Sequence, residues 1–431
     1  MSPGPTGPVL SVATGPADGA PEPAAAAAAA ASPLATDASD GEIRRRITAI
    51  WLLLFINVLT PRPDAPSLFP ISKPLGQLLT GCCLAVALIL ALGLNRRLVV
   101  RPNLVLGLAT ILAATAFITS IRGLAGMGSL LRCARLFGFL GVLWLLTPWW
   151  GRRDLLIARA HLKALLVVCG TVLVGLVVAP GKALSGAGAH RLIGVVWSIP
   201  APQVAEYAAL VAGMAVALWA AGGLRFRTAA AAAGLGLAMI AATQTRTALV
   251  AVAVATTAAV LVMFRARRRV RRAVTIVVVA VPLLFLAMAP VVMDWFDRDQ
   301  SSTEIAGLTG RRQVWDALLA APHAEFNHWF GFGLSDKSFG GLAIDSTWLA
   351  VYHDEGLFGV GVIGVTLAYL LVAAVRHPTG PERSLAVFLV VYVAVASYTE
   401  VGLGDASPYL LSVVAAASLV TPRGAAARRS A

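Results

Sequence analysis

Residues 75–94 have the sequence LGQLLTGCCLAVALILALGL, twenty consecutive positions without a charged side chain. A helix of about 20 residues is about 30 Å long, which matches the thickness of the hydrocarbon core of a bilayer. The basic pair Arg96 and Arg97 follows almost at once. This stretch therefore predicts a transmembrane helix.

The whole chain has the composition of a membrane protein. Hydrophobic residues make up 58% of its 431 residues and charged residues only 13%, whereas soluble domains are about 45–50% apolar and about 25% charged. This excludes a soluble enzyme, a coiled coil and a disordered regulator. Because lipid offers the backbone no hydrogen-bond partners, the apolar segments should be helices, and we predict an all-α polytopic protein with about twelve transmembrane helices. The other apolar segments are 47–60, 103–119, 128–147, 164–179, 203–221, 228–243, 247–264, 273–291, 356–375, 385–401 and 407–420.

The basic residues predict how the chain is oriented. Residues 1–40 are rich in Pro and Ala and predict a disordered tail, 41–424 form the membrane domain, and 425–431 are a basic tail. With a cytoplasmic N-terminus, 23 of the 35 basic residues fall in cytoplasmic segments. This is the positive-inside pattern, and it also places the C-terminus in the cytoplasm. The net charge of +14 therefore needs no nucleic acid to explain it.

One connection, 292–355, is much longer than the others and should be extracytoplasmic. It holds ten of the 21 acidic residues together with Trp315, Trp329 and Trp348. Loops longer than about 15 residues are usually functional or disordered, and the aromatic content argues against disorder. A short helix is predicted to begin near Thr309, with Val314 and Trp315 on its apolar stripe. Arg311 and the next residue lie in its first turn, where cations do not stabilise a helix, which favours an anionic partner.

Three arginines lie in or near apolar segments. Arg246, in a tight outer connection, is either an interfacial anchor or a phosphate-binding group, since guanidinium matches phosphate oxygens bidentately. Arg132 and Arg135 share one face of a predicted helix. They either pair with Glu206 or Glu400 or bind an anion, because facing lipid would be too costly.

The end of the long loop carries candidate acid–base groups. Asp345 is either a general base or the cap of a helix that begins at Ser346. The four cysteines form no zinc or disulfide pattern, and His323 and His328 are wrongly spaced for two ligands on one helix face. The glycines near 331–341 follow no strand of a nucleotide-binding unit. We therefore expect neither a metal nor a cofactor.

Four short motifs lie in order over about residues 190–360. They resemble those of the O-antigen ligase and polysaccharide polymerase superfamily, often called the Wzy family, which has about twelve spans and a long late extracytoplasmic loop. The matching stretches are Arg191–Gly194 followed by Pro200 and Pro202, Thr243–Arg246, Gly310–Trp315 with one extra arginine, and Asp345–Leu349 followed by Glu355-Gly356 and Gly359.

The resemblance implies an activity and a set of partners. A membrane glycosyltransferase, similar to the GT-C type, would act at the outer face of the bacterial cytoplasmic membrane. It would move a glycan from a polyprenyl diphosphate to a hydroxyl of a glycan, lipid or protein acceptor, without a nucleotide or a metal. Asp345 stands where the ligases have His, with Ser346 in place of Asn, which is more similar to the capsule and exopolysaccharide polymerases.

The resemblance also suggests a role for each candidate residue. Asp345 is the expected base, with Glu355 the second choice. The negative charge that develops on the leaving diphosphate needs fixed positive groups. The arginines expected to supply them are Arg246, Arg191, Arg311, Arg132 and Arg135.

Two other classes of function compete with this one. A lipid-linked oligosaccharide flippase or another twelve-helix transporter would place polar groups near mid-membrane in both halves and show an internal repeat. The polar candidates instead cluster on the outer side, and the chain shows no repeat. A structural membrane protein would give no reason for arginines within apolar segments.

Overall fold

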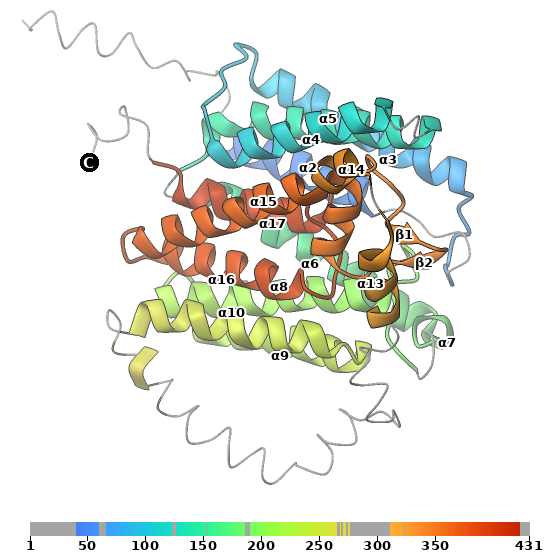
Figure 1. The fold of residues 1–431 in the computed structure, drawn as a ribbon. Helices are drawn as coiled ribbons and strands as arrows, with labels where there is room; N and C mark the ends of the chain where they lie inside the picture. Colours follow the sequence, from blue (N-terminus) through green and yellow to red (C-terminus); the bar gives the residue numbers. More distant parts are fainter. Residues whose placement is uncertain are drawn as a thin grey trace, which may run out of the picture.

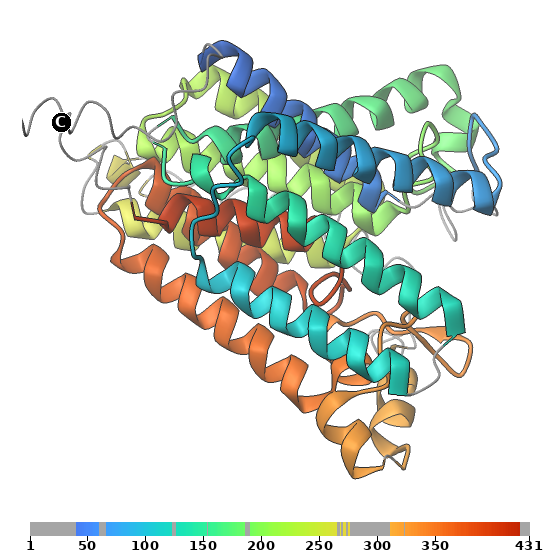
Figure 2. The ribbon, with the colours of Figure 1, turned by 90° about the horizontal axis from the view of Figure 1, so that it is seen from above.

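The computed structural model describes residues 40–59, 66–122, 126–152, 154–185, 190–264, 268, 270–272, 275, 311–322 and 324–422. Within these ranges the chain is a bundle of long helices that run alongside one another (Figures 1 and 2). The long helices are α2 (Asp40–Val58), α3 (Lys73–Leu94), α4 (Leu104–Arg122), α5 (Gly126–Leu145), α6 (Leu156–Val178), α8 (Ala201–Ala221), α9 (Phe226–Thr243), α10 (Arg246–Phe264), α15 (Thr347–Arg376), α16 (Pro381–Ala396) and α17 (Pro408–Val420).

The helices confirm the all-α membrane class. Eleven of the twelve predicted apolar segments coincide with described helices, and the segment 273–291 lies largely outside the described residues. Among the described residues, eight helices are long and apolar enough to cross a membrane. One predicted boundary was wrong, because α16 ends at Ala396 rather than near 401. Helix α15 begins at Thr347, one residue after the predicted helix start at Ser346, and the part that follows Gly356 corresponds to the predicted span 356–375.

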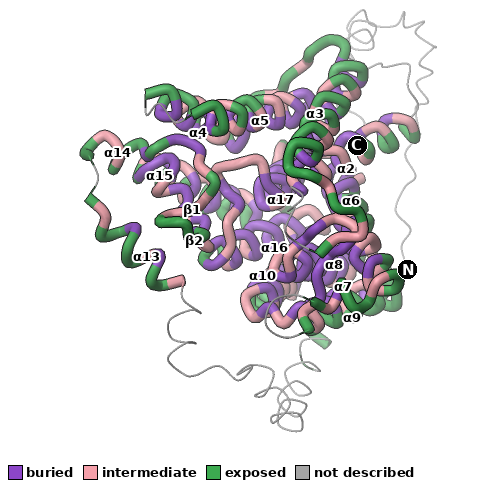
Figure 3. Tube along the Cα trace, turned by 90° about the vertical axis from the view of Figure 1, so that its right-hand side faces the viewer, coloured by how far each residue is buried: buried purple, intermediate pink, exposed green. Residues whose placement is uncertain are grey.

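Helix α8 lies at the centre of its half of the bundle, packed against α6, α9, α10 and α16. It is mostly buried, whereas α3 and α9 expose broad faces (Figure 3). Small residues allow these close approaches. A side-chain carbon on Gly213 would lie 2.0 Å from the ring of Phe388, and one on Gly236 would lie 2.6 Å from the carbonyl oxygen of Ala208.

Polar contacts also join helices that are distant in sequence. Buried His161 on α6 accepts a hydrogen bond at Nδ1 from the indole of Trp51 on α2 (3.2 Å), and its Nε2 lies 3.3 Å from the hydroxyl of Ser412 on α17. An ion pair between Arg44 and Asp154 (3.2 Å) links the start of α2 to the segment before α6. The contacts of Trp51 and Arg44 restrain the packing of α2, and the contact of Ser412 holds α17 against α6.

The short elements gather at one end of the bundle. They are α7 (Pro180–Ala183), α13 (Arg311–Ala320), α14 (Glu325–Phe330) and the antiparallel strands β1 (Ser338–Phe339) and β2 (Leu342–Ala343) (Figure 1). A 3₁₀ turn, η1 (Thr147–Trp149), follows α5. Helix α13 confirms the short helix predicted in the long loop and docks through buried Val314 and Leu318. Thr309 and Gly310, its predicted start, lie outside the described residues.

Helix α15 is broken at Gly356, which has a φ of 66° and a ψ of −165°, a conformation open almost only to glycine. The break frees two backbone carbonyls, and the loop after α14 satisfies them. The amide of Phe332 donates to the carbonyl of His353 (3.0 Å), and the amide of Gly333 donates to that of Asp354 (2.8 Å). A side-chain carbon on Gly356 would lie 2.3 Å from the carbonyl carbon of Trp329. The break is therefore also where the long loop crosses α15 at close range.

This crossing predicts that Gly356→Ala destabilises the protein. The strained φ alone costs about 1–3 kcal/mol, and the contact with the backbone of Trp329 adds to that cost. Gly361→Ala is the matched control, because a side-chain carbon there meets no atom within 4 Å and alanine favours the helix. We expect a lower Tm in detergent for Gly356→Ala alone. Equal Tm values for the two variants would contradict this account of the break.

Candidate functional site

Two connections at the same end as α13 are tied together by Arg191. Its Nε donates to the carbonyl oxygen of Thr243 (2.8 Å), and its Nη2 donates to the hydroxyl of Thr245 (3.3 Å). These threonines flank Gln244, which has a φ of 52° in the turn between α9 and α10. Arg246 is the first residue of α10. The arginine of one predicted motif therefore holds the turn that presents the arginine of the next.

Arg311, in the first turn of α13, faces two carboxylates. Its Nε lies 3.2 Å from Oδ2 of Asp345, and its Nη2 lies 3.9 Å from Oε1 of Glu400. Asp345 keeps 46% of its side-chain surface exposed, whereas Glu400 keeps 21%. Two residues far apart in the chain thus flank one guanidinium, and the more exposed of them is the predicted base.

The start of α15 fixes where Glu400 lies. The N-cap of this helix is Ser346, so the alternative in which Asp345 caps the helix is wrong. The hydroxyl of Thr347 donates to the carbonyl oxygen of Glu400 (2.7 Å) and accepts from the amide of Gly402 (3.1 Å). The hydroxyl of Thr399 donates to that of Thr247 on α10 (3.1 Å). The segment after α16 is therefore attached to the helices that carry Asp345 and Arg246.

We call Arg191, Arg246, Arg311, Asp345 and Glu400 the arginine cluster. Burial lowers the pKa of Arg191, and Arg311 adds to this while Glu400 opposes it. Burial, helped by Asp345 and opposed by Arg311 and Arg191, raises the pKa of Glu400 to about 7. The arginines outnumber the carboxylates, so the cluster can accept an anion. Its charge also changes near neutral pH.

Arg132 and Arg135 belong to a second group of charges. Nε of Arg135 donates to the side-chain oxygen of Asn57 (3.1 Å), and Arg135 also lies in the electrostatic field of Asp405. Arg132 acts electrostatically on Asp336 in the loop after α14. The contacts of both arginines thus differ from the predicted pairing with Glu206 or Glu400, which was wrong.

The second group continues to Lys337 and the acids of α15. Lys337 is paired with Asp354, whose other oxygen lies 3.1 Å from Nδ1 of His353. Burial disfavours the charged ammonium of Lys337, but the attraction of Asp354, Asp405 and Glu355 outweighs it and raises the pKa. This group thus attaches the loop after α14 to α15 by a buried ion pair.

Glu355, the second choice for the base, is fully buried. Its carboxylate is enclosed by two glycines. A side-chain carbon on Gly404 would lie 2.9 Å from Oε2 of Glu355, and one on Gly359 would lie 3.1 Å from the same oxygen. In this motif Gly356 therefore allows the break in the helix, and Gly359 allows the carboxylate of Glu355 to pack closely. An acceptor hydroxyl has no path to this residue through the described residues.

Glu400 was not predicted as part of the site. Glu400 lies within the apolar run 385–401, which was predicted as a membrane span. Hydropathy alone does not show that α16 stops at Ala396. The available signal was a single acid followed by the turn residues Gly402 and Gly404. Lys337 was missed for a different reason: it is one of several charges in a long polar loop.

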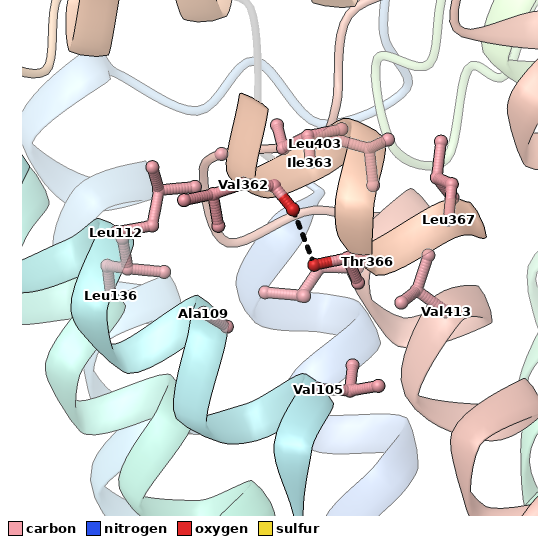
Figure 4. A pocket seen from close by; sticks show the side chains of 12 residues that line it. Val105, Ala109, Leu112, Leu136, Val362, Ile363, Thr366, Leu367, Leu403 and Val413 are labelled. Carbon is pink, nitrogen blue, oxygen red and sulfur yellow. Dashed lines mark hydrogen bonds between the residues drawn. The ribbon is translucent and has the colours of Figure 1, made fainter. Parts of the chain in front are cut away.

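Two further features of the described residues concern metal ligands and an apolar cavity inside the bundle. No group of three or more His, Cys, Asp or Glu side chains among them is arranged to hold a metal ion. An apolar cavity between α4, α5, α15 and α17, lined by Leu112, Val362 and Val413 among others, measures only about 40 Å³ (Figure 4). That is space for a few water molecules at most, so this cavity is a packing gap.

A comparison with known protein families finds a match that includes part of the arginine cluster. Residues 230–359 match the family model described as O-antigen ligase. This part of the chain is thus similar to the O-antigen ligase family. The search of curated proteins finds no match. The predicted resemblance is thus confirmed.

The region matched to the O-antigen ligase family runs from α9 to the Gly359 turn of α15. It contains Arg246, Arg311 and Asp345 of the arginine cluster. Arg191 and Glu400 lie outside it in sequence, and the structure joins them to the matched part through the α9–α10 turn and the start of α15. The arginine cluster therefore spans the matched region and both of its flanks.

Proposed function

We propose that this protein polymerises or ligates a polyprenyl-diphosphate-linked oligosaccharide at the outer face of the bacterial cytoplasmic membrane. The family match supports a glycosyl-transferring membrane enzyme in general. The observation that carries the finer proposal is the position of Arg311. Its guanidinium lies close to the carboxylates of Asp345 and Glu400. Arg311 and Glu400 also act electrostatically on Arg191. Such a cluster supplies both cations for a diphosphate and a carboxylate for a hydroxyl.

The proposed step is a direct displacement at the anomeric carbon of the donor sugar. The acceptor oxygen forms a bond to this carbon while the bond from the carbon to the diphosphate oxygen breaks. The acceptor proton passes to the carboxylate of Asp345, and polyprenyl diphosphate leaves with the electron pair. Arg191, Arg246 and Arg311 stabilise the charge that develops on the leaving group. The step needs neither a nucleotide nor a redox partner.

The contacts divide the predicted arginines between two roles. The guanidinium of Arg135 donates to Asn57 on α2, and Arg132 acts electrostatically on Asp336. We therefore assign the diphosphate to Arg191, Arg246 and Arg311. We assign Arg135 to holding α5 against the end of α2, and Arg132 to attracting the loop after α14. Asp345 remains the proposed base, because it is exposed while Glu355 is buried.

The proposal is tested with purified protein in lipid nanodiscs that contain the polyprenyl-diphosphate-linked glycan and an acceptor glycan, with no nucleotide present. Both faces of a nanodisc are open to solution, so a flippase produces no chemical change there. The proposal predicts a longer glycan and free polyprenyl diphosphate in equal amounts. Intact donor after incubation with active protein would favour the transporter alternative.

The proposed orientation has its own test, in a cysteine-free background of the protein. Ser338→Cys lies at the end that carries the arginine cluster, and Thr379→Cys lies in the exposed connection between α15 and α16 at the opposite end. An impermeant thiol reagent applied to intact protoplasts should modify the first and spare the second. Modification of Thr379→Cys alone would reverse the orientation and remove the site from the outer face.

The ionisation of Glu400 predicts a pH dependence. Glu400 is neutral below pH 7 and charged above it, because its pKa is about 7. Ionisation removes one unit of net positive charge from the arginine cluster, which is worth at least about 1 kcal/mol at close range. We expect the KM for the donor to rise about fivefold or more between pH 6 and pH 8.

Glu400→Gln is the control for this prediction, because it stays neutral at every pH. Its donor KM should stay nearly constant between pH 6 and pH 8, because both phosphates of the donor are esterified and each keeps a single negative charge. A wild-type rise that persists unchanged in Glu400→Gln would contradict the prediction. A collapse of kcat in this variant would instead make Glu400 the base.

A further inference from the structure

An open cleft lies beside the arginine cluster, between α13 and the start of α15. It measures about 590 Å³, within the range of about 300–1,000 Å³ that is typical of small-molecule sites. Aromatic and polar side chains share its walls. They include Trp315, Trp348, Tyr398, Arg312, Asp316 and Ser346.

The aromatic side chains of the cleft are only partly used in packing. The rings of Trp315 and Tyr398 meet edge to face, with centroids 5.5 Å apart, and 57% of Tyr398 is exposed. Nε1 of Trp315 is enclosed but has no hydrogen-bond partner among the described residues. A buried indole N–H normally has an acceptor. The aromatic rings, rather than this enclosed N–H, therefore form the surface that the cleft offers to a ligand.

The polar groups of the cleft suit the same kind of ligand. Arg312 and Asp316 lie 3.7 Å apart on one face of α13, and each keeps more than two thirds of its side chain exposed. Sugars combine apolar C–H faces, which pack on aromatic rings, with hydroxyl groups that donate and accept hydrogen bonds. A cleft of mixed aromatic and hydrogen-bonding character is therefore complementary to a saccharide.

The position of the cleft separates it from the proposed diphosphate site. Its walls include Arg312, next to Arg311, and Ser346, next to Asp345. None of its lining residues comes from the loop 190–200 or from the α9–α10 turn, where Arg191 and Arg246 lie. Arg311 and Asp345 are thus sequence neighbours of two cleft residues, whereas Arg191 and Arg246 do not line the cleft.

We propose that this cleft is the binding site for the acceptor saccharide, with Trp315, Trp348 and Tyr398 as its contact surface. The assignment to the acceptor rather than the donor rests on the proposed function. A saccharide seated there would extend from Asp345 outward along α13.

The test measures binding of a lipid-free saccharide by calorimetry, with no donor present. The probe is the oligosaccharide that mild acid releases from the donor lipid of the same cells. Trp315→Ala and Trp348→Ala should each weaken binding about tenfold. Trp315→Phe keeps an aromatic ring in the cleft, so it should bind more tightly than Trp315→Ala. The matched control is Trp329→Ala, an exposed tryptophan on α14 outside the cleft, which should bind as wild type does.

Kinetics separate this proposal from the proposed function. In the transfer assay the cleft variants should raise the KM for the acceptor and leave that for the donor unchanged. Saccharide binding that depends on Trp315 in a protein without transfer activity would keep the cleft and remove the proposed function. Unchanged binding and acceptor KM in Trp315→Ala and Trp348→Ala would overturn the acceptor site. An equal loss in Trp329→Ala would overturn it as well.

Discussion

Asp345→Asn is expected to lower kcat for glycan transfer by at least about 10²-fold, the low end for removal of a general base. The amide keeps the size of the side chain and an oxygen that accepts from Nε of Arg311, which lies 3.2 Å from Asp345. The helix cap is untouched, because Ser346 is the N-cap of α15. The variant should therefore fold and insert normally. His at position 345 should keep part of the activity, since imidazole can also accept the proton.

The kinetic pattern separates a base from a positioning residue. If Asp345 only oriented Arg311, the amide oxygen would preserve much of that contact, and the loss would fall on the KM for the donor. Asp336→Asn is the matched control, because this exposed carboxylate lies in the same loop outside the arginine cluster. A normal kcat in Asp345→Asn would exclude the carboxylate as the base and direct attention to Glu400.

Arg246→Lys is expected to lower kcat by about 10²-fold, comparable to the loss of one donor that stabilises a developing charge. Lysine keeps the positive charge but loses the planar fork that binds two phosphate oxygens at once. An interfacial anchor would tolerate this change, because lysine also extends to the membrane surface. The reaction should be followed as release of free polyprenyl diphosphate.

Arg227→Lys is the control for this substitution. Arg227 is exposed and lies in the first turn of α9, at the other end of that helix from the turn that leads to Arg246. We expect wild-type turnover from it. Wild-type turnover from Arg246→Lys as well would leave Arg246 as an anchor.

Hydropathy predicted the helices well because lipid permits few other structures. It failed where a polar residue stood close to an apolar run. The predicted span 385–401 includes Glu400, but α16 ends at Ala396, and the segment that follows it bonds to Thr347 at the start of α15. The break at Gly356 was also missed. A glycine in an apolar segment has the same hydropathy whether or not the helix continues through it.

The candidate site was predicted in its residue types but not in its contacts. The motifs indicated Arg191, Arg246, Arg311 and Asp345 as separate points on the chain. The ion pair of Arg311 with Asp345 and the approach of Glu400 depend on how α13 docks and how α16 ends, and no local pattern encodes either. Arg132 and Arg135 look equally suitable in the sequence. Only the hydrogen bond of Arg135 to Asn57 and the electrostatic effect of Arg132 on Asp336 set them apart.

The central claim is that the arginine cluster holds the diphosphate of the donor, and a structure of the protein with a donor analogue tests it most directly. In the analogue a methylene group replaces the oxygen between the sugar and the diphosphate, so transfer is blocked. The measurement is the position of its two phosphorus atoms. We predict that phosphate oxygens lie within hydrogen-bond distance of Arg191, Arg246 and Arg311, with the anomeric carbon facing Asp345. Phosphorus atoms bound instead at Arg132, Arg135 and Lys337 would contradict the account.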